Sequence, residues 1–158
     1  MAIVERNRLA APWLSRVYRE WLSRIDDKLA PLAPTLVRIS LGVIIFPHGF
    51  AKLFLDDAVP TARNFVAFGW AYPLAWSYFI GVTETLAGIL LVIGLFTRVA
   101  AMGLFIEMMV ISFAVLYPSW SWGRRGMEYA LFMGLIALSI FMQGGGRYAA
   151  DNLLLKKT

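Results

Sequence analysis

Long apolar segments alternate with short polar ones along most of the chain. A helix needs about 20 mostly apolar residues to cross the roughly 30 Å hydrocarbon core of a bilayer. Four segments approach that length, namely residues 34–55, 74–95, 99–116 and 127–143. The pattern therefore predicts an all-α integral membrane protein with a four-helix bundle, and the mean hydropathy of +0.66 agrees with this prediction.

The segment before the first predicted span has a different pattern. Between residues 12 and 29, apolar side chains recur at helical spacing, and charged side chains take the other side. Tyr18 and Trp21 stand close to arginines, which is typical of a helix that lies in the membrane interface. We expect an N-terminal amphipathic interfacial helix, which serves either as a topology anchor or as a docking helix for a partner subunit. Pro31 and Pro34 separate it from the first span.

The placement of the basic residues predicts the topology. Six of the fifteen precede the first span, and Arg147, Lys156 and Lys157 follow the last. This positive-inside pattern places both termini in the cytoplasm. We predict a cytoplasmic interfacial helix and tail over residues 1–33, a bundle of four transmembrane helices over residues 34–146, and a basic cytoplasmic tail over residues 147–158. Topology thus accounts for the net charge of +5, so the lipid bilayer is the expected partner and nucleic acid is not.

The chain has no cysteine and one histidine, His48. Disulfides, thiol nucleophiles, CxxC redox pairs and cysteine-ligated iron–sulfur clusters are therefore excluded for this chain. A bis-histidine haem is excluded within one protomer, whereas a His/Met pair or a haem shared with a partner stays open. We expect no metal site and no covalently bound cofactor.

Ionisable side chains interrupt the predicted spans. The first span carries Arg38, His48 and Lys52 on one face, and Glu84 and Glu107 lie near the middles of the second and third. A basic residue at mid-depth costs about 2.5–3.5 kcal/mol on translocon scales. We therefore expect these side chains to point into the bundle and to find partners there.

The rise per residue of a helix places four ionisable side chains in the outer half of the bundle. They are His48, Lys52, Glu84 and, in the first turn of the fourth predicted span, Glu128. Ion pairing alone explains the set, because membrane bundles are held together partly by buried polar groups. The alternative is a pocket for a polar head group, in which His48 and Glu84 handle protons. A kink at Pro47 is expected to make room beside the histidine.

A second set of charged residues, Arg38, Arg98 and Asp151, gathers near the inner face and is expected to form a structural polar cluster. Glu107 belongs to neither set. It faces either the bundle or another subunit, and in the second case it is a candidate partner-contact residue.

Short motifs recur at fixed places in the predicted spans. The first span has Arg38, Gly42, His48-Gly49 and Lys52; the second has Glu84, Gly88, Gly94-Leu95 and Thr97-Arg98; the fourth has Gly126, Glu128 to Leu131, Gly144 to Tyr148 and Asp151. In their order and spacing, over about residues 34–155, they resemble the DoxX family of four-span bacterial membrane proteins. Pro47 and the pair Ala149-Ala150 depart from the family pattern.

The resemblance implies a four-helix bundle in the bacterial inner membrane and a link to redox chemistry, since some members are subunits of a thiosulfate:quinone oxidoreductase. The first functional hypothesis is a redox-associated subunit that binds a quinone-like molecule among His48, Lys52, Glu84 and Glu128. This chain carries no electrons itself under that hypothesis and needs a cofactor-bearing partner or a bound quinone. The alternative is a non-catalytic accessory or assembly subunit of a membrane complex or a homo-oligomer. A small transporter is a third class, which the short chain and the lack of a repeat disfavour.

Overall fold

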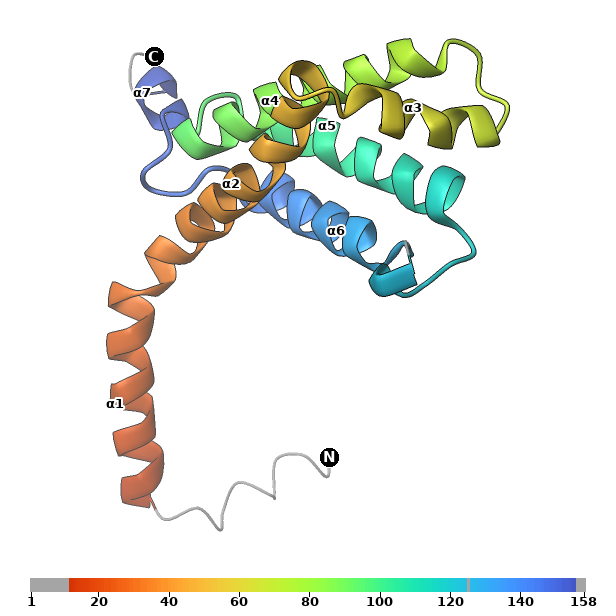
Figure 1. The fold of residues 1–158 in the computed structure, drawn as a ribbon. Coiled ribbons are helices and arrows are strands. Elements are labelled where there is room, and N and C mark those ends of the chain that lie inside the picture. Colours follow the sequence, from red (N-terminus) through yellow and green to blue (C-terminus); the bar gives the residue numbers. More distant parts are fainter. Residues whose placement is uncertain (1–11, 125, 156–158) are drawn as a thin grey trace.

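The computed structural model describes residues 12–124 and 126–155, and this part of the chain folds into helices without a strand (Figure 1). The predicted cytoplasmic charges Arg6, Arg8, Lys156 and Lys157 lie outside the described residues.

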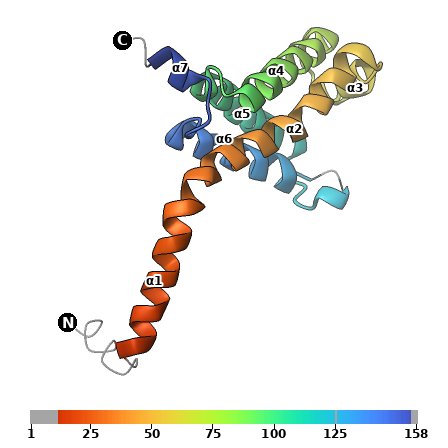
Figure 2. The ribbon, with the colours of Figure 1, turned by 90° about the vertical axis from the view of Figure 1, so that its left-hand side faces the viewer.

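Helix α1 (Pro12–Lys28) projects away from the other helices, as Figures 1 and 2 both show. A 3₁₀ turn, η2 (Ala30–Leu32), connects it to α2. The Tyr18 and Trp21 side chains are exposed, and their rings lie 6.4 Å apart between centroids. The segment is helical where the pattern predicted a helix, and its position in the membrane interface stays a prediction.

Helix α2 (Ala33–Phe54) continues through Pro47, and the shorter helix α3 (Ala58–Ala67) follows it. The chain then enters α4 (Pro73–Ile93), against which α3 packs. Phe65 of α3 is 2% exposed, and the Ser77 hydroxyl of α4 donates a hydrogen bond of 2.8 Å to the Ala58 carbonyl. The loop between the first two spans is therefore folded back onto the second.

Helix α5 (Thr97–Val110) ends in a π-helical segment, η3 (Ile111–Leu116). A loop with the 3₁₀ turn η4 (Trp122–Arg124) leads to α6 (Glu128–Gln143), and the short helix α7 (Asp151–Leu155) completes the described chain.

Three helical segments are long and apolar enough to cross a membrane: Ala30–Phe54, Pro73–Ile93 and Thr97–Leu116. Their bounds agree with the first three predicted spans to within a few residues. Helix α6 coincides with the fourth predicted span, but its 16 residues are fewer than the roughly 20 that a perpendicular crossing needs. The described part is thus an all-helical membrane protein with three candidate spans, and the fourth crossing stays a prediction.

Helices α2 and α4 pack closely because glycines face each other across their contact. A Cβ on Gly42 would lie 2.7 Å from the Gly88 carbonyl oxygen, and one on Gly49 would lie 2.7 Å from the Gly81 carbonyl oxygen. Small residues allow this approach of two backbones, which is how helices commonly associate in lipid. On the other side, α5 packs along α6. Aliphatic side chains between the two pairs form the core, including Leu41, Ile45, Leu91, Leu104, Met133 and Ile140.

Candidate functional site

A buried ion pair joins the first two spans. The Lys52 Nζ lies 2.6 Å from the Glu84 Oε2, and the same ammonium group donates a hydrogen bond of 3.1 Å to the His48 carbonyl. Lys52 is 9% exposed and Glu84 4% exposed. The close glycine contacts bring α2 and α4 near enough for this pair to form.

Glu107 of α5 lies beside the ion pair. Its carboxyl group interacts electrostatically with both Glu84 and Lys52. Both Glu107 oxygens are buried, and within the described part of the chain no hydrogen bond of standard geometry reaches either one. The carboxyl group thus lies among the helices of its own chain, and a contact with another subunit stays a prediction.

His48 is exposed and lines a groove of about 430 Å³. Glu84 lines the same groove from α4, and Tyr129 lines it from α6. The other walls are mostly aliphatic, from Ile45, Met108, Ile111, Leu116 and Ala130. We call this the His48 groove. It brings together His48 and Glu84, two of the four residues predicted for the outer set.

The other two predicted residues of that set are near the groove without lining it. Lys52 reaches the groove through its ion pair with Glu84. Glu128 is half-buried in the first turn of α6, directly before Tyr129. Tyr129 was not among the predicted site residues, although its place next to Glu128 in the fourth-span motif is a signal for it.

A second groove, of about 360 Å³, lies on the other side of Glu107. Aromatic side chains of α3, α4 and the loop between them line it, namely Phe65, Trp70, Trp76 and Phe79. Glu107 and the first π-helical residue, Ile111, line it from α5 and η3. We call this the aromatic groove. Because Ile111 also lines the His48 groove, the two grooves approach each other at this residue.

The inner polar set surrounds the point where the C-terminal tail returns to the bundle. Arg38 is 1% exposed and donates hydrogen bonds to the carbonyls of Gly145 (3.0 Å) and Val92 (2.8 Å), and also to that of Leu91. Arg38 also interacts electrostatically with Asp151. The buried guanidinium thus connects α2, the end of α4 and the tail.

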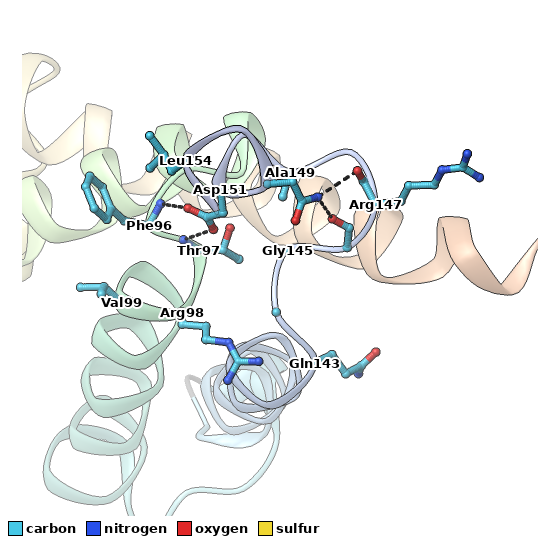
Figure 3. Close-up of a pocket in the computed structure, with 13 residues that line it drawn as sticks. Phe96, Thr97, Arg98, Val99, Gln143, Gly145, Arg147, Ala149, Asp151 and Leu154 are labelled. Atoms are coloured by element: carbon cyan, nitrogen blue, oxygen red, sulfur yellow. Dashed lines mark hydrogen bonds between the residues drawn. The ribbon is translucent and has the colours of Figure 1, made fainter. Parts of the chain in front are cut away.

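Asp151 holds the start of α5. Its carboxylate accepts hydrogen bonds from the backbone N–H groups of Phe96 (2.7 Å) and Thr97 (3.0 Å), as Figure 3 shows. Arg98 points away from it, toward the end of α6, where it donates a long bond of 3.5 Å to the Met142 carbonyl. The predicted cluster therefore occupies one end of the molecule, and Arg38 interacts electrostatically with Asp151, but the three members have separate hydrogen-bond partners.

A surface pocket of about 630 Å³ lies beside these residues (Figure 3). Arg98, Arg147 and Asp151 line it together with the glycines that follow α6. No group of three His, Cys, Asp or Glu side chains in the described residues is arranged to hold a metal ion.

Comparison with known proteins identifies the family. The DoxX family model matches residues 33–116, which run from the start of α2 to the end of η3. An uncharacterized protein of Haemophilus influenzae is 32% identical over 139 residues, covering 83% of this chain and 97% of the relative. An uncharacterized membrane protein of Mycobacterium tuberculosis is 27% identical over 140 residues, covering 80% and 84%. No solved structure matches the chain. The chain belongs to the DoxX family.

Proposed function

We propose that this membrane protein is a redox-associated subunit that binds a quinone-like, lipid-soluble molecule in the His48 groove. The observation that carries the proposal is that His48 and Glu84 both line a groove whose other walls are mostly aliphatic. Its volume of about 430 Å³ falls in the range of about 300–1,000 Å³ that is usual for small-molecule sites.

The side chains of the groove suit the oxygens of a quinone. A neutral imidazole carries one N–H donor and one acceptor nitrogen, so His48 can donate to a quinone carbonyl or accept from a quinol hydroxyl. The hydroxyl group of Tyr129 can likewise donate or accept a hydrogen bond. Reduction of a quinone to a quinol adds two electrons and two protons. This chain offers groups for the protons, and the electrons come from a cofactor-bearing partner or from a second molecule in its quinol form, which is oxidised to the quinone.

We also propose that α6 completes a four-span bundle in the bacterial inner membrane with both termini in the cytoplasm. Local thinning of the bilayer and snorkelling of flanking side chains accommodate a helix that is a few residues too short, at modest cost. The distribution of basic residues supports this orientation.

The second candidate function is a non-catalytic accessory subunit. It is favoured by α1, which projects from the bundle and exposes Val17, Tyr18 and Trp21. Removal of residues 1–29 tests this candidate in native membranes. Loss of a stoichiometric partner from the purified complex supports docking through α1, and a partner that is retained contradicts it.

Photolabelling with an azidoquinone tests quinone binding in the full chain reconstituted into nanodiscs. We expect adducts on peptides that carry His48 or Tyr129, competed by unlabelled quinone and reduced several-fold in His48→Ala. Ile44→Ala is the matched control, because Ile44 is on the same helix and exposed. Labelling that follows the exposed surface of the helices and is unchanged in His48→Ala contradicts the proposal.

A further inference from the structure

Two carboxyl groups share one cationic partner inside the bundle. Glu84 forms the ion pair with Lys52, and Glu107 interacts with both. His48 also interacts with Glu84 from the groove side. The further titratable groups near this site are Tyr129, which lines the His48 groove, and Glu128 directly before it in α6. If both carboxyl groups were ionised, the Lys52 charge would balance only one of them.

The surroundings of Glu107 disfavour a second negative charge. Its two oxygens are buried, and no hydrogen bond of standard geometry reaches either one from the described residues. The carboxyl group of Glu84 is close enough to interact with it. An isolated carboxylate transferred from water to such a site costs far more than a neutral carboxyl group, so the group keeps a proton instead. Glu84 beside it adds like-charge repulsion, which in a carboxyl pair favours a single shared proton.

We propose that Glu84 and Glu107 together hold one exchangeable proton, with Lys52 balancing the remaining negative charge. The pair separates the two grooves, because Glu84 lines the His48 groove and Glu107 lines the aromatic groove. A proton held by the pair can therefore be exchanged through the His48 groove, while the aromatic groove admits lipid-soluble molecules to the Glu107 side. The proposal rests on charge and burial and stands whether or not a quinone binds.

A lipid-soluble carbodiimide tests the proton, because it reacts with protonated carboxyl groups in apolar surroundings. The carboxylic acid adds across a C=N bond of the reagent, its proton goes to nitrogen, and the O-acylisourea rearranges to a stable N-acylurea without loss of atoms. With dicyclohexylcarbodiimide and the full chain in liposomes, we expect one adduct on the peptide that contains Glu107. Glu107→Gln should abolish the adduct, and raising the pH should reduce it.

Two controls separate this site from ordinary surface carboxyl groups. Glu20→Gln, at an exposed carboxyl group on α1, should leave the Glu107 adduct unchanged. A water-soluble carbodiimide should label the exposed Asp56 and Asp57 before it labels Glu107. Absence of a Glu107 adduct at every pH, while other carboxyl groups are labelled, overturns the proposal.

Infrared spectroscopy of the wild type gives an independent readout that needs no variant. At neutral pH we expect the C=O stretch of one protonated carboxylic acid, which shifts to lower frequency in D₂O because the proton exchanges. Glu107→Gln should remove the band, whereas Glu20→Gln should retain it. A wild-type spectrum without a protonated carboxyl band overturns the shared proton, whatever the quinone experiments show.

Discussion

The ammonium group of Lys52 lies 2.6 Å from the carboxylate of Glu84, and both side chains are buried between α2 and α4. Breaking a buried ion pair by removing one partner typically costs about 3–5 kcal/mol, since a charge is left without compensation. Removal of either partner should therefore weaken the contact between the first two spans.

We predict that Lys52→Met lowers the free energy of unfolding by about 3–5 kcal/mol. Adding Glu84→Gln to the same chain should restore much of the loss, because the uncompensated carboxylate is then gone. Denaturant unfolding in detergent micelles measures both effects. Lys28→Met at the exposed end of α1 is the control and should change stability by less than about 0.5 kcal/mol. A double variant as unstable as the single one would contradict the pairing.

The contact between α2 and α4 predicts that Gly49→Ala is destabilising. The added methyl group would lie 2.7 Å from the Gly81 carbonyl oxygen, and overpacking of this kind costs about 1–3 kcal/mol. Gly103→Ala is the matched control in α5, because an added Cβ meets nothing within 4 Å there. It should be neutral or raise stability by up to about 1 kcal/mol. Thermal unfolding of the two variants in the same detergent distinguishes them.

Arg38→Lys should destabilise the junction of α2, α4 and the tail. Arg38 donates from two different nitrogens, Nε to Gly145 and Nη1 to Val92, and a lysine ammonium cannot reproduce this planar fork. A hydrogen bond made by a charged group contributes about 1.5–3 kcal/mol, so we expect a loss of that size. Proteolysis of the tail should speed up accordingly. Arg98→Lys, at an exposed side chain, should change little.

Asp151 acts as a remote cap of α5, which predicts an order among its variants. Its two oxygens bond two different N–H groups, of Phe96 and of Thr97. Asn retains one acceptor oxygen and Ala none, so stability should fall from wild type to Asp151→Asn to Asp151→Ala. The complete loss should be about 0.5–2 kcal/mol. Chemical denaturation checks the order, and equal effects of Asn and Ala would show that the second bond contributes nothing.

The crossing of α6 can be tested with reporters. If α6 spans the membrane, a fluorescent protein fused after the tail should fluoresce in the cytoplasm, while alkaline phosphatase inserted in the loop before α6 should be active outside. If α6 does not cross, the tail and that loop lie on the same side of the membrane. Only one of the two reporters should then be active.

Much of the helical architecture could be predicted from the apolar periodicity, because long hydrophobic runs leave the chain few alternatives to helices. The depths of Lys52 and Glu84 in their predicted spans also placed both in the same half of the bundle, and the structure pairs them. The site could not be predicted in full, since the helical face of a residue does not say which neighbour packs against it. The aromatic groove depends on α3 folding back onto α4, and Phe65 gave no signal of that in the sequence.

Tail contacts could be predicted only in part, since the sequence placed Asp151 near Arg38 but did not indicate its hydrogen bonds to the start of α5. Asp151 and Phe96 are far apart in the chain, and their hydrogen bond depends on the turn that the glycines after α6 allow. The position of Glu107 beside Glu84 follows from the rotation of α5 about its axis, which a single helix pattern does not fix. His48 was expected inside the bundle, yet its side chain is exposed along the groove.

The π-helical segment Ile111–Leu116 sets the direction of its own side chains up to Leu116, after which the chain becomes extended at Tyr117. A π turn takes in more residues than an α turn, so Leu116 points in a different direction from the one that ordinary α periodicity would give it. Deleting one residue within this segment would rotate Leu116 out of the His48 groove and leave Glu107, one turn earlier, where it is. The shape of one groove can thus change during evolution without disturbing the carboxyl pair behind it.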